Sequence, residues 1–218
     1  MARKIVEQVK NAVLYDDGLI KLMNVRFSYP HLRKPYAGKK GKGDQGEPKF
    51  GIVAMLDKKT HKEAKRLIEG RIDEILKEAK VRALAADKKF LRDGDEHEND
   101  DYAGHWIVSA RESRRPSLRD EEREIVDPEN ADEVFYGGCY GSVLIRPWWQ
   151  NNDFGKRVNA GLTAVRKSRD GEAFGEGRIS DEEVDEAFGD DEDDDAPASR
   201  SSSKKGGSRY EDDDPDDL

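Results

Sequence analysis

Two short stretches of the sequence combine aromatic rings with positive charges at close spacing. Residues 26–36 read RFSYPHLRKPY, and residues 146–157 read RPWWQNNDFGKR. A ring can stack on the flat face of a base, and arginine and lysine side chains pair with phosphates. The same residue types can also close over an apolar core or cover an oligomer interface. The rest of the chain must therefore decide between ligand contact and packing.

The candidates for ligand contact come from both segments and from the lysines of the stretch AGKKGKGDQGEP at 37–48. Neighbouring residues on a strand point to opposite faces, so at most one of Trp148 and Trp149 is expected to face a core. The full candidate set is Arg26, Tyr29, Arg33, Lys34, Tyr36, Lys39, Lys40, Lys42, Arg146, Trp148, Trp149, Lys156 and Arg157. Arg114, Arg115, Arg166 and Lys167 are weaker candidates for phosphate contact.

Three patterns that could indicate catalysis or a cofactor fit poorly. GKGDQG at 41–46 matches G-x-G-x-x-G, but it lies between a proline-rich stretch and a strand, and no helix follows it. GGCYG at 137–141 has the spacing of a nucleophile elbow with Cys139 at its centre, yet a strand-like run follows. The acidic run at 93–101 lacks the glycine and glutamate of a calcium loop. We therefore predict no catalytic residue, cofactor or metal.

Charge is distributed unevenly along the 218 residues, which carry a net charge of −9. Residues 181–218 contain 17 acidic and 4 basic side chains, so the remainder is mildly basic. This composition predicts a folded domain over 1–180 and a disordered acidic tail over 181–218. The single cysteine excludes an internal disulfide and favours a reducing compartment. With no apolar run long enough to cross a membrane, the chain is expected to be soluble and cytoplasmic.

Hydrophobic patterning predicts a mainly β fold. Alternating or apolar runs indicate strands at 18–29, 49–56, 105–111, 136–150 and 156–167, with the last two forming a hairpin. A proline-rich loop should follow the first strand. From Thr60 the period becomes helical, and Thr60 with Glu63 suggests a capping box. The remaining segments, 93–101 and 112–123, are expected to be polar connections. These elements predict a five-stranded, OB-fold-like barrel with one amphipathic helix.

The order of several motifs resembles a known family. VRFSYPHLRKP, EPKFGIVAMLDKK, HWIVSAR, VFYGGCYGSVLIRPWW and GLTAVRKSRDGEAFG follow one another as in the tailed-phage single-stranded-DNA-binding proteins of the Enterobacter-phage type. The resemblance implies an OB-fold that coats single-stranded DNA in replication or recombination, with no catalysis and no cofactor. It also implies an acidic C-terminal tail that contacts other replication proteins. Here the chain departs from a terminal aromatic residue, since it ends in DDDPDDL and has Phe188 further inside.

We therefore expect a cationic groove lined by rings that holds single-stranded DNA without strong sequence preference. The acidic tail would compete for this groove and bind a polymerase, helicase or nuclease through Phe188, Asp212, Asp213, Asp214, Asp216, Asp217 and Leu218. We also expect the protein to form a homodimer and to act in the host bacterial cytoplasm. The alternative is a protein-interaction module whose basic, aromatic face is an oligomer interface or binds an acidic partner.

Overall fold

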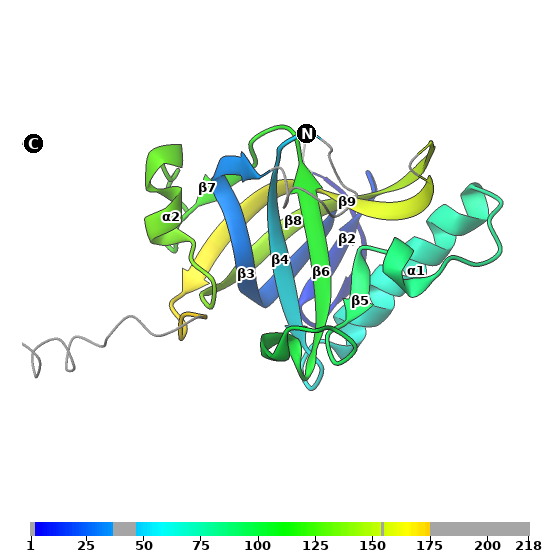
Figure 1. Ribbon diagram of the computed structural model, residues 1–218, viewed down its shortest axis with the longest axis horizontal. Helices are drawn as coiled ribbons and strands as arrows, with labels where there is room; N and C mark the ends of the chain where they lie inside the picture. Colours follow the sequence, from blue (N-terminus) through cyan, green and yellow to red (C-terminus); the bar gives the residue numbers. More distant parts are fainter. Residues whose placement is uncertain (1–2, 37–46, 154, 175–218) are drawn as a thin grey trace, which may run out of the picture. The chain divides into compact units, whose positions relative to one another are not determined.

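The computed structural model describes residues 3–36, 47–153 and 155–174 (Figure 1). Its strands are β1 (Ile5–Val9), β2 (Ala12–Tyr15), β3 (Ile20–Tyr36), β4 (Lys49–Asp57), β5 (Leu91–Asp93), β6 (His105–Glu112), β7 (Ser117–Arg119), β8 (Tyr140–Asn152) and β9 (Gly155–Arg169). Its α-helices are α1 (Lys62–Glu78) and α2 (Ala131–Val134). Most of the lysine-rich stretch at 37–48 and all of the segment 181–218 lie outside the described residues. Among the described residues, no helix is long and apolar enough to cross a membrane.

Within this part of the chain the nine strands form one sheet. The strand order is β5-β6-β4-β3-β8-β9-β7, and the β1–β2 hairpin joins it through pairing of β2 with β3. All ladders are antiparallel except the short β7–β9 pairing. β9 also approaches β6, and an isolated bridge joins Lys89 to Val158. The mainly β prediction is confirmed, but the sheet has more than five strands and no continuous ladder closes it.

The segment expected to be a proline-rich loop is the second half of strand β3. Proline fixes φ near −65°, a value that an extended strand tolerates where no ladder hydrogen bond from its nitrogen is needed. The β3–β4 register shifts between Ser28 and His31 and again before Tyr36, so Pro30 and Pro35 fall at irregular positions. Tyr29 has a φ of 45°, which marks the first irregularity. The rings of Tyr29 and Tyr36 therefore lie on a strand of the sheet and not on a loop.

The amphipathic helix is confirmed, whereas the capping box is wrong. Helix α1 buries Ala64, Leu67, Ile68, Ile72, Ile75 and Leu76 and packs on β8 and on the β1–β2 hairpin. Its N-cap residue is His61, and no side chain caps the first turn. The carboxylate of Asp57 instead accepts hydrogen bonds from the backbone N–H groups of Lys59 and Thr60, at 2.8 and 2.9 Å. Asp57 thus orders the turn before the helix.

The sequence patterns miss four strands, β1, β2, β5 and β7, each of only three to five residues. Strand β1 exposes four of its five residues, and β7 has three residues that pair in parallel with β9. A three-residue strand in a polar stretch carries too little periodicity to be detected. The predicted strands at 49–56 and 105–111 and the hairpin of β8 with β9 are confirmed.

Close packing of neighbouring elements against Gly141 holds the centre of the sheet. The ring of Phe27 is fully buried against Phe135, and it fills the space above Gly141. A Cβ atom on Gly141 would lie 2.1 Å from the carbonyl oxygen of Arg166 and 2.4 Å from Cζ of Phe27. Cys139, between the glycines of GGCYG, is also fully buried, and burial raises the pKa of its thiol. Strand β8 follows Cys139 directly, in agreement with the strand-like run predicted there.

We predict that Gly141→Ala destabilises the fold by about 1–3 kcal/mol or more, because backbone or a packed ring must move to admit one methyl group. The matched control is Gly70→Ala on α1, where a Cβ atom would meet nothing within 4 Å. Relief of the glycine entropy cost should make this second variant more stable by about 0.5–1 kcal/mol. Urea unfolding of both variants measures the difference. Equal stability of the two variants would contradict the packing described for Phe27.

Candidate nucleic-acid interface

Strands β3, β4 and β6 lie side by side and present one face away from the core (Figure 1). On β4, Ile52, Ala54 and Leu56 belong to the main core, so the residues between them point to the opposite face. The registers align His31, Gly51 and Arg111 in one row across the three strands. Ser28, Val53 and Ser109 form the next row. We call the surface made by these two rows and by Tyr36 the outer face.

Aromatic rings border the outer face along β3. The rings of His31 and Tyr36 stack with centroids 4.4 Å apart and an angle of 12° between their planes. Tyr36 is 45% exposed and Tyr29 is 60% exposed. The hydroxyl oxygen of Tyr29 accepts a hydrogen bond of 3.4 Å from Nδ2 of Asn99. Exposed rings on a sheet are the kind of surface on which bases stack.

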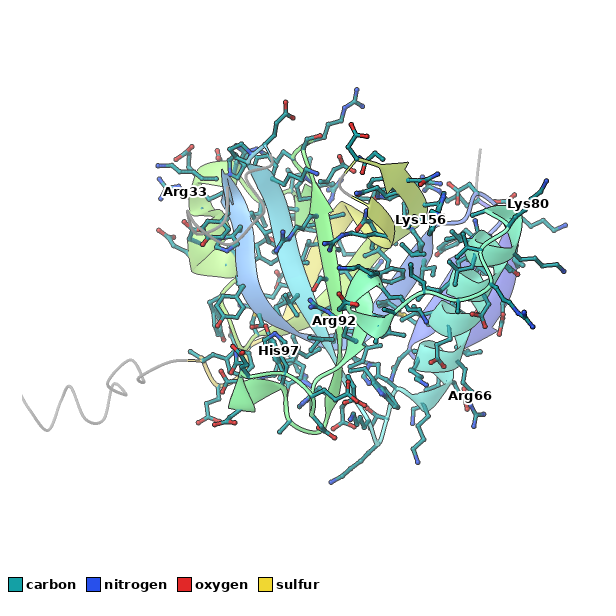
Figure 2. All side chains as sticks on the ribbon, turned by 45° about the vertical axis from the view of Figure 1, so that its right-hand side comes forward. Arg33, Arg66, Lys80, Arg92, His97 and Lys156 are labelled. Carbon is teal, nitrogen blue, oxygen red and sulfur yellow. The ribbon has the colours of Figure 1, made fainter. Side chains whose placement is uncertain are left out.

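Arg111 and Arg92 bring positive charge to the same face. Gly51 leaves room for the Arg111 side chain, whose Cγ lies 3.2 Å from the place where a Cβ atom of residue 51 would be. Arg92, on β5, donates a hydrogen bond of 3.3 Å to Oγ of Ser109 and lies close to β6 in Figure 2. Its Nε is buried and has no hydrogen-bond partner. The outer face therefore offers hydrogen-bond donors suited to an anion.

His31 is a neutral member of this surface at pH 7. Burial lowers its pKa from the ordinary value of 6.5, and the nearby Arg111 guanidinium lowers it further. The carboxylate of Asp132 acts in the opposite direction. An anion placed beside His31 would favour its protonated form. The charge of this face is therefore sensitive to what binds there.

Several predicted phosphate contacts already have partners within the protein. Arg33 donates to the Glu129 carboxylate at 2.8 Å and lies 3.7 Å from a carboxylate oxygen of Asp132. Arg146 pairs with the Asp17 carboxylate at 2.9 Å, and Lys167 pairs with Asp170 at 2.6 Å. Arg26 donates to the backbone oxygens of Gly138 and Glu172. A phosphate would have to compete with these groups or join them.

The β8–β9 hairpin carries the second aromatic and basic segment. Trp148 is 43% exposed, whereas Trp149 packs against the core, as expected for adjacent residues on a strand. Lys156 and Arg157 are exposed, and Figure 2 shows Lys156 on this hairpin. A Cβ atom on Gly161 of β9 would lie 3.0 Å from a carboxylate oxygen of Glu112 on β6. The base of the hairpin thus borders the end of β6.

The remaining candidates differ in their surroundings. Lys34, Arg114 and Arg115 are exposed, and the Arg115 guanidinium lies 5.0 Å from the centroid of the Phe50 ring. Arg166 is half-buried. Lys39, Lys40 and Lys42 lie outside the described residues. So do the tail residues Phe188, Asp212, Asp213, Asp214, Asp216, Asp217 and Leu218.

Asp93 and Asp95, from the acidic run at 93–101, bind the ammonium group of Lys58, with 2.7 Å between Nζ and Asp95. In the described ranges no three His, Cys, Asp or Glu side chains are grouped to hold a metal ion. These carboxylates therefore form an ion pair that ties the end of β4 to β5.

The sequence patterns missed His31, Arg92, Arg111 and Ser109 as members of one surface. Alternation on β4 and β6 could have assigned Gly51, Val53, Ser109 and Arg111 to a common side, since odd positions of both strands are less apolar than the even ones. The pairing of His31 with Gly51 could not be foreseen, because it depends on the irregular register after Ser28.

Comparison with known proteins gives consistent matches over this domain. A family model described as "Enterobacter phage Enc34, ssDNA-binding protein" matches residues 19–197. A protein designated p50 from Acyrthosiphon pisum secondary endosymbiont phage 1 is 31% identical over 177 residues, covering 77% of this chain and 92% of p50.

Two solved structures of the single-stranded DNA-binding protein from bacteriophage Enc34 are also similar. The one in complex with ssDNA is 43% identical, with a TM-score of 0.74, and the match covers 79% of this chain and 98% of that chain. The one described without DNA is also 43% identical, with a TM-score of 0.73 over 84% of this chain and 99% of that chain. The chain therefore belongs to the Enc34 family of phage ssDNA-binding proteins.

Proposed function

We propose that this protein binds single-stranded DNA on the outer face of β3, β4 and β6. The observation that carries the proposal is the combination of exposed rings on β3 with Arg111 and Arg92 on one face of the sheet. It is supported by membership in a family in which a solved relative, 43% identical, is described in complex with ssDNA. Strand faces of this type bind oligonucleotides in OB-folds.

The contacts available on the outer face suit binding without strong sequence preference. Tyr29 and Tyr36 offer flat surfaces that any base can cover, and guanidinium groups bind phosphates regardless of sequence. Lys34, Lys156 and Arg157 are exposed cations that can extend the contact to the backbone of the strand. Such a protein coats and protects single strands during replication or recombination in the host bacterial cytoplasm, without catalysis.

The acidic segment 181–218 is proposed to regulate this binding. Its charges suit competition with DNA for the basic surface, and a random coil of about 38 residues would have a root-mean-square span of roughly 30–35 Å. An attached competitor acts at an effective concentration that can approach the millimolar range. DNA that displaces the segment would free Phe188, the terminal acidic residues and Leu218 to bind a polymerase, helicase or nuclease. A homodimer remains part of this proposal.

The alternative function is a protein-interaction module in which the rings and cations form an oligomer interface or hold an acidic partner. The solved relative in complex with ssDNA makes us prefer DNA as the ligand. Titration with oligothymidylate at moderate salt separates the two, because an interaction module has no reason to bind it.

The first test replaces the exposed rings. Tyr29→Ala and Tyr36→Ala should each weaken binding to oligothymidylate by about 1–3 kcal/mol while the fold survives, because each removes an exposed stacking surface along β3. Fluorescence or anisotropy titration measures the affinity. Trp149→Ala is the comparison, and it should lower the free energy of unfolding because Trp149 packs on the core. Unchanged affinity in both exposed-ring variants would place the DNA elsewhere.

The second test uses the protonation of His31. A bound phosphate should raise the pKa of His31, so the complex holds more protons than the free protein. Affinity should therefore increase as the pH falls from the raised pKa of His31 in the complex toward its lower pKa in the free protein, and it should be constant above that window. Titrations at pH 7.5 and 5.5 measure the change. His31→Gln should remove this component, and an identical pH dependence in the variant would exclude His31 from the interface.

The third test removes the acidic segment. Deletion of residues 190–218 should tighten DNA binding about tenfold, or roughly 1.4 kcal/mol, with the largest gain at low salt, where charge screening is weakest. The same deletion should abolish binding to replication partners. A free peptide of residues 181–218 should compete with DNA for the truncated protein. Failure of the peptide to compete at millimolar concentration and low salt would show that the segment does not occupy the DNA surface.

A further inference from the structure

A second basic site lies on the same side of the sheet as the outer face, next to the part of β3 that precedes Ser28. It is a cavity of about 370 Å³ where β3, the start of β8, the end of β9 and the turn before α1 meet. Its lining includes Lys10, Asn11, Asn24, Arg26, Tyr140 and Arg169. Arg26 is the register partner of Met55, and Met55 also lines the cavity. We call this cavity the Arg169 pocket.

The charge of the Arg169 pocket is positive and incompletely neutralised. Lys10, Arg26 and Arg169 contribute three cations, and Asp57 contributes the one carboxylate of the lining. That carboxylate already accepts three hydrogen bonds from Lys59 and Thr60. Among the described residues, no carboxylate forms an ion pair with the side chain of Lys10 or Arg169. The pocket therefore has capacity for an anion.

The cations are held in place by rings and carbonyl groups. The Arg169 guanidinium lies 3.5 Å from the centroid of the Tyr140 ring, and the Arg26 guanidinium lies 5.9 Å from the same centroid. Arg26 is also 4.1 Å from the centroid of the Phe174 ring. Its Nε and Nη2 donate to the carbonyl oxygens of Gly138 and Glu172, which leaves Nη1 available. Two guanidinium groups beside one ring repel each other unless an anion joins them.

Neutral groups around the cations also favour the binding of an anion. Thr60 and His61 precede helix α1, and the first turn of this helix has no side-chain cap. The partial positive charge of a helix N-terminus favours an anion. Asn24 holds Asn11 through a hydrogen bond of 2.9 Å, and Asn11 donates to the carbonyl oxygen of Thr60 at 3.2 Å. These links fix the two amides at the border of the pocket.

We propose that the Arg169 pocket binds a phosphate group of the DNA strand, at a subsite separate from the outer face. The proposal rests on the proposed function. Along β3, His31 lies five residues beyond Arg26, a distance of about 16 Å. A strand within the footprint of an OB-fold, about 4–16 nucleotides, covers this distance. Tyr102 forms a buried cluster with Met55 and Ile107, and Phe174 packs against this cluster.

The experiment compares Lys10→Ala and Arg169→Ala with Arg82→Ala, a control that removes an exposed arginine remote from the pocket. Affinity for an oligothymidylate of about twenty nucleotides is measured over a range of salt concentrations. Each pocket variant should reduce the magnitude of the log–log salt slope by about 0.7, the value for one phosphate contact on a single strand. The control should leave the slope unchanged. Arg169→Lys, which keeps the charge, should retain most of the slope if the wild-type fold survives.

A second measurement detects phosphate binding in the pocket directly. The side-chain amide NMR signals of Asn11 and Asn24 should shift on addition of inorganic phosphate to the wild-type protein and should not shift in Arg169→Ala. Once the salt slope and the amide shifts show the site, equal affinity for oligothymidylates with and without a 5′-phosphate assigns it to the strand backbone, and tighter binding of the phosphorylated form assigns it to a strand end.

The inference is overturned if the pocket variants keep the wild-type salt slope and phosphate leaves both amides unshifted while the wild-type protein binds oligothymidylate. In that case the proposed function stands and the subsite fails. It is also overturned if only an acidic peptide shifts the amides. Absence of oligothymidylate binding by the wild-type protein would instead refute the proposed function, and the phosphate titration would then decide the pocket alone.

Discussion

The packing of the Phe27 ring above Gly141 is the constraint on which the rest of this structure depends. Phe27 donates its backbone N–H to the Cys139 oxygen, and its own carbonyl accepts from Gly138, both at 2.8 Å. These bonds fix β3 against the start of β8, and the ring occupies the volume that a side chain at residue 141 would need. From this point β3 leaves β8 and continues along β4. The rings of Tyr29, His31 and Tyr36 stand on that continuation.

The partners of the basic residues divide them into two groups. Arg33, Arg146 and Lys167 form ion pairs with the carboxylates of Glu129, Asp17 and Glu121, which belong to distant segments, and so help to hold the fold. Arg169 is held by a ring, and Arg92 by a single hydroxyl group, with its Nε unpartnered. Since a cation already paired gains less from a phosphate, the second group marks the surfaces that suit DNA better than the count of basic residues does.

Much of the fold could be predicted from the sequence because apolar periodicity is strong in β4, β6, β8, β9 and α1. The β1–β2 hairpin could not, since both strands are short and β1 is mostly exposed. The capping box failed because Asp57, three residues before Thr60, takes the backbone donors of the turn. For the site, residue types located the rings. Arg146 is paired with Asp17, which is 129 residues away, and local sequence patterns carry no information about such a contact.

The pairing of β3 with β8 has a consequence for how the chain folds during synthesis. Arg26 and Gly138, joined by a hydrogen bond at this ladder, are 112 residues apart in the sequence. Contacts at such separation form late and slow the folding of β proteins. While the ribosome produces the intervening residues, β3 can pair with β2 and β4, but its edge toward β8 has no partner. A nascent chain stalled before residue 138 would expose this edge, so we expect it to be the aggregation-prone intermediate.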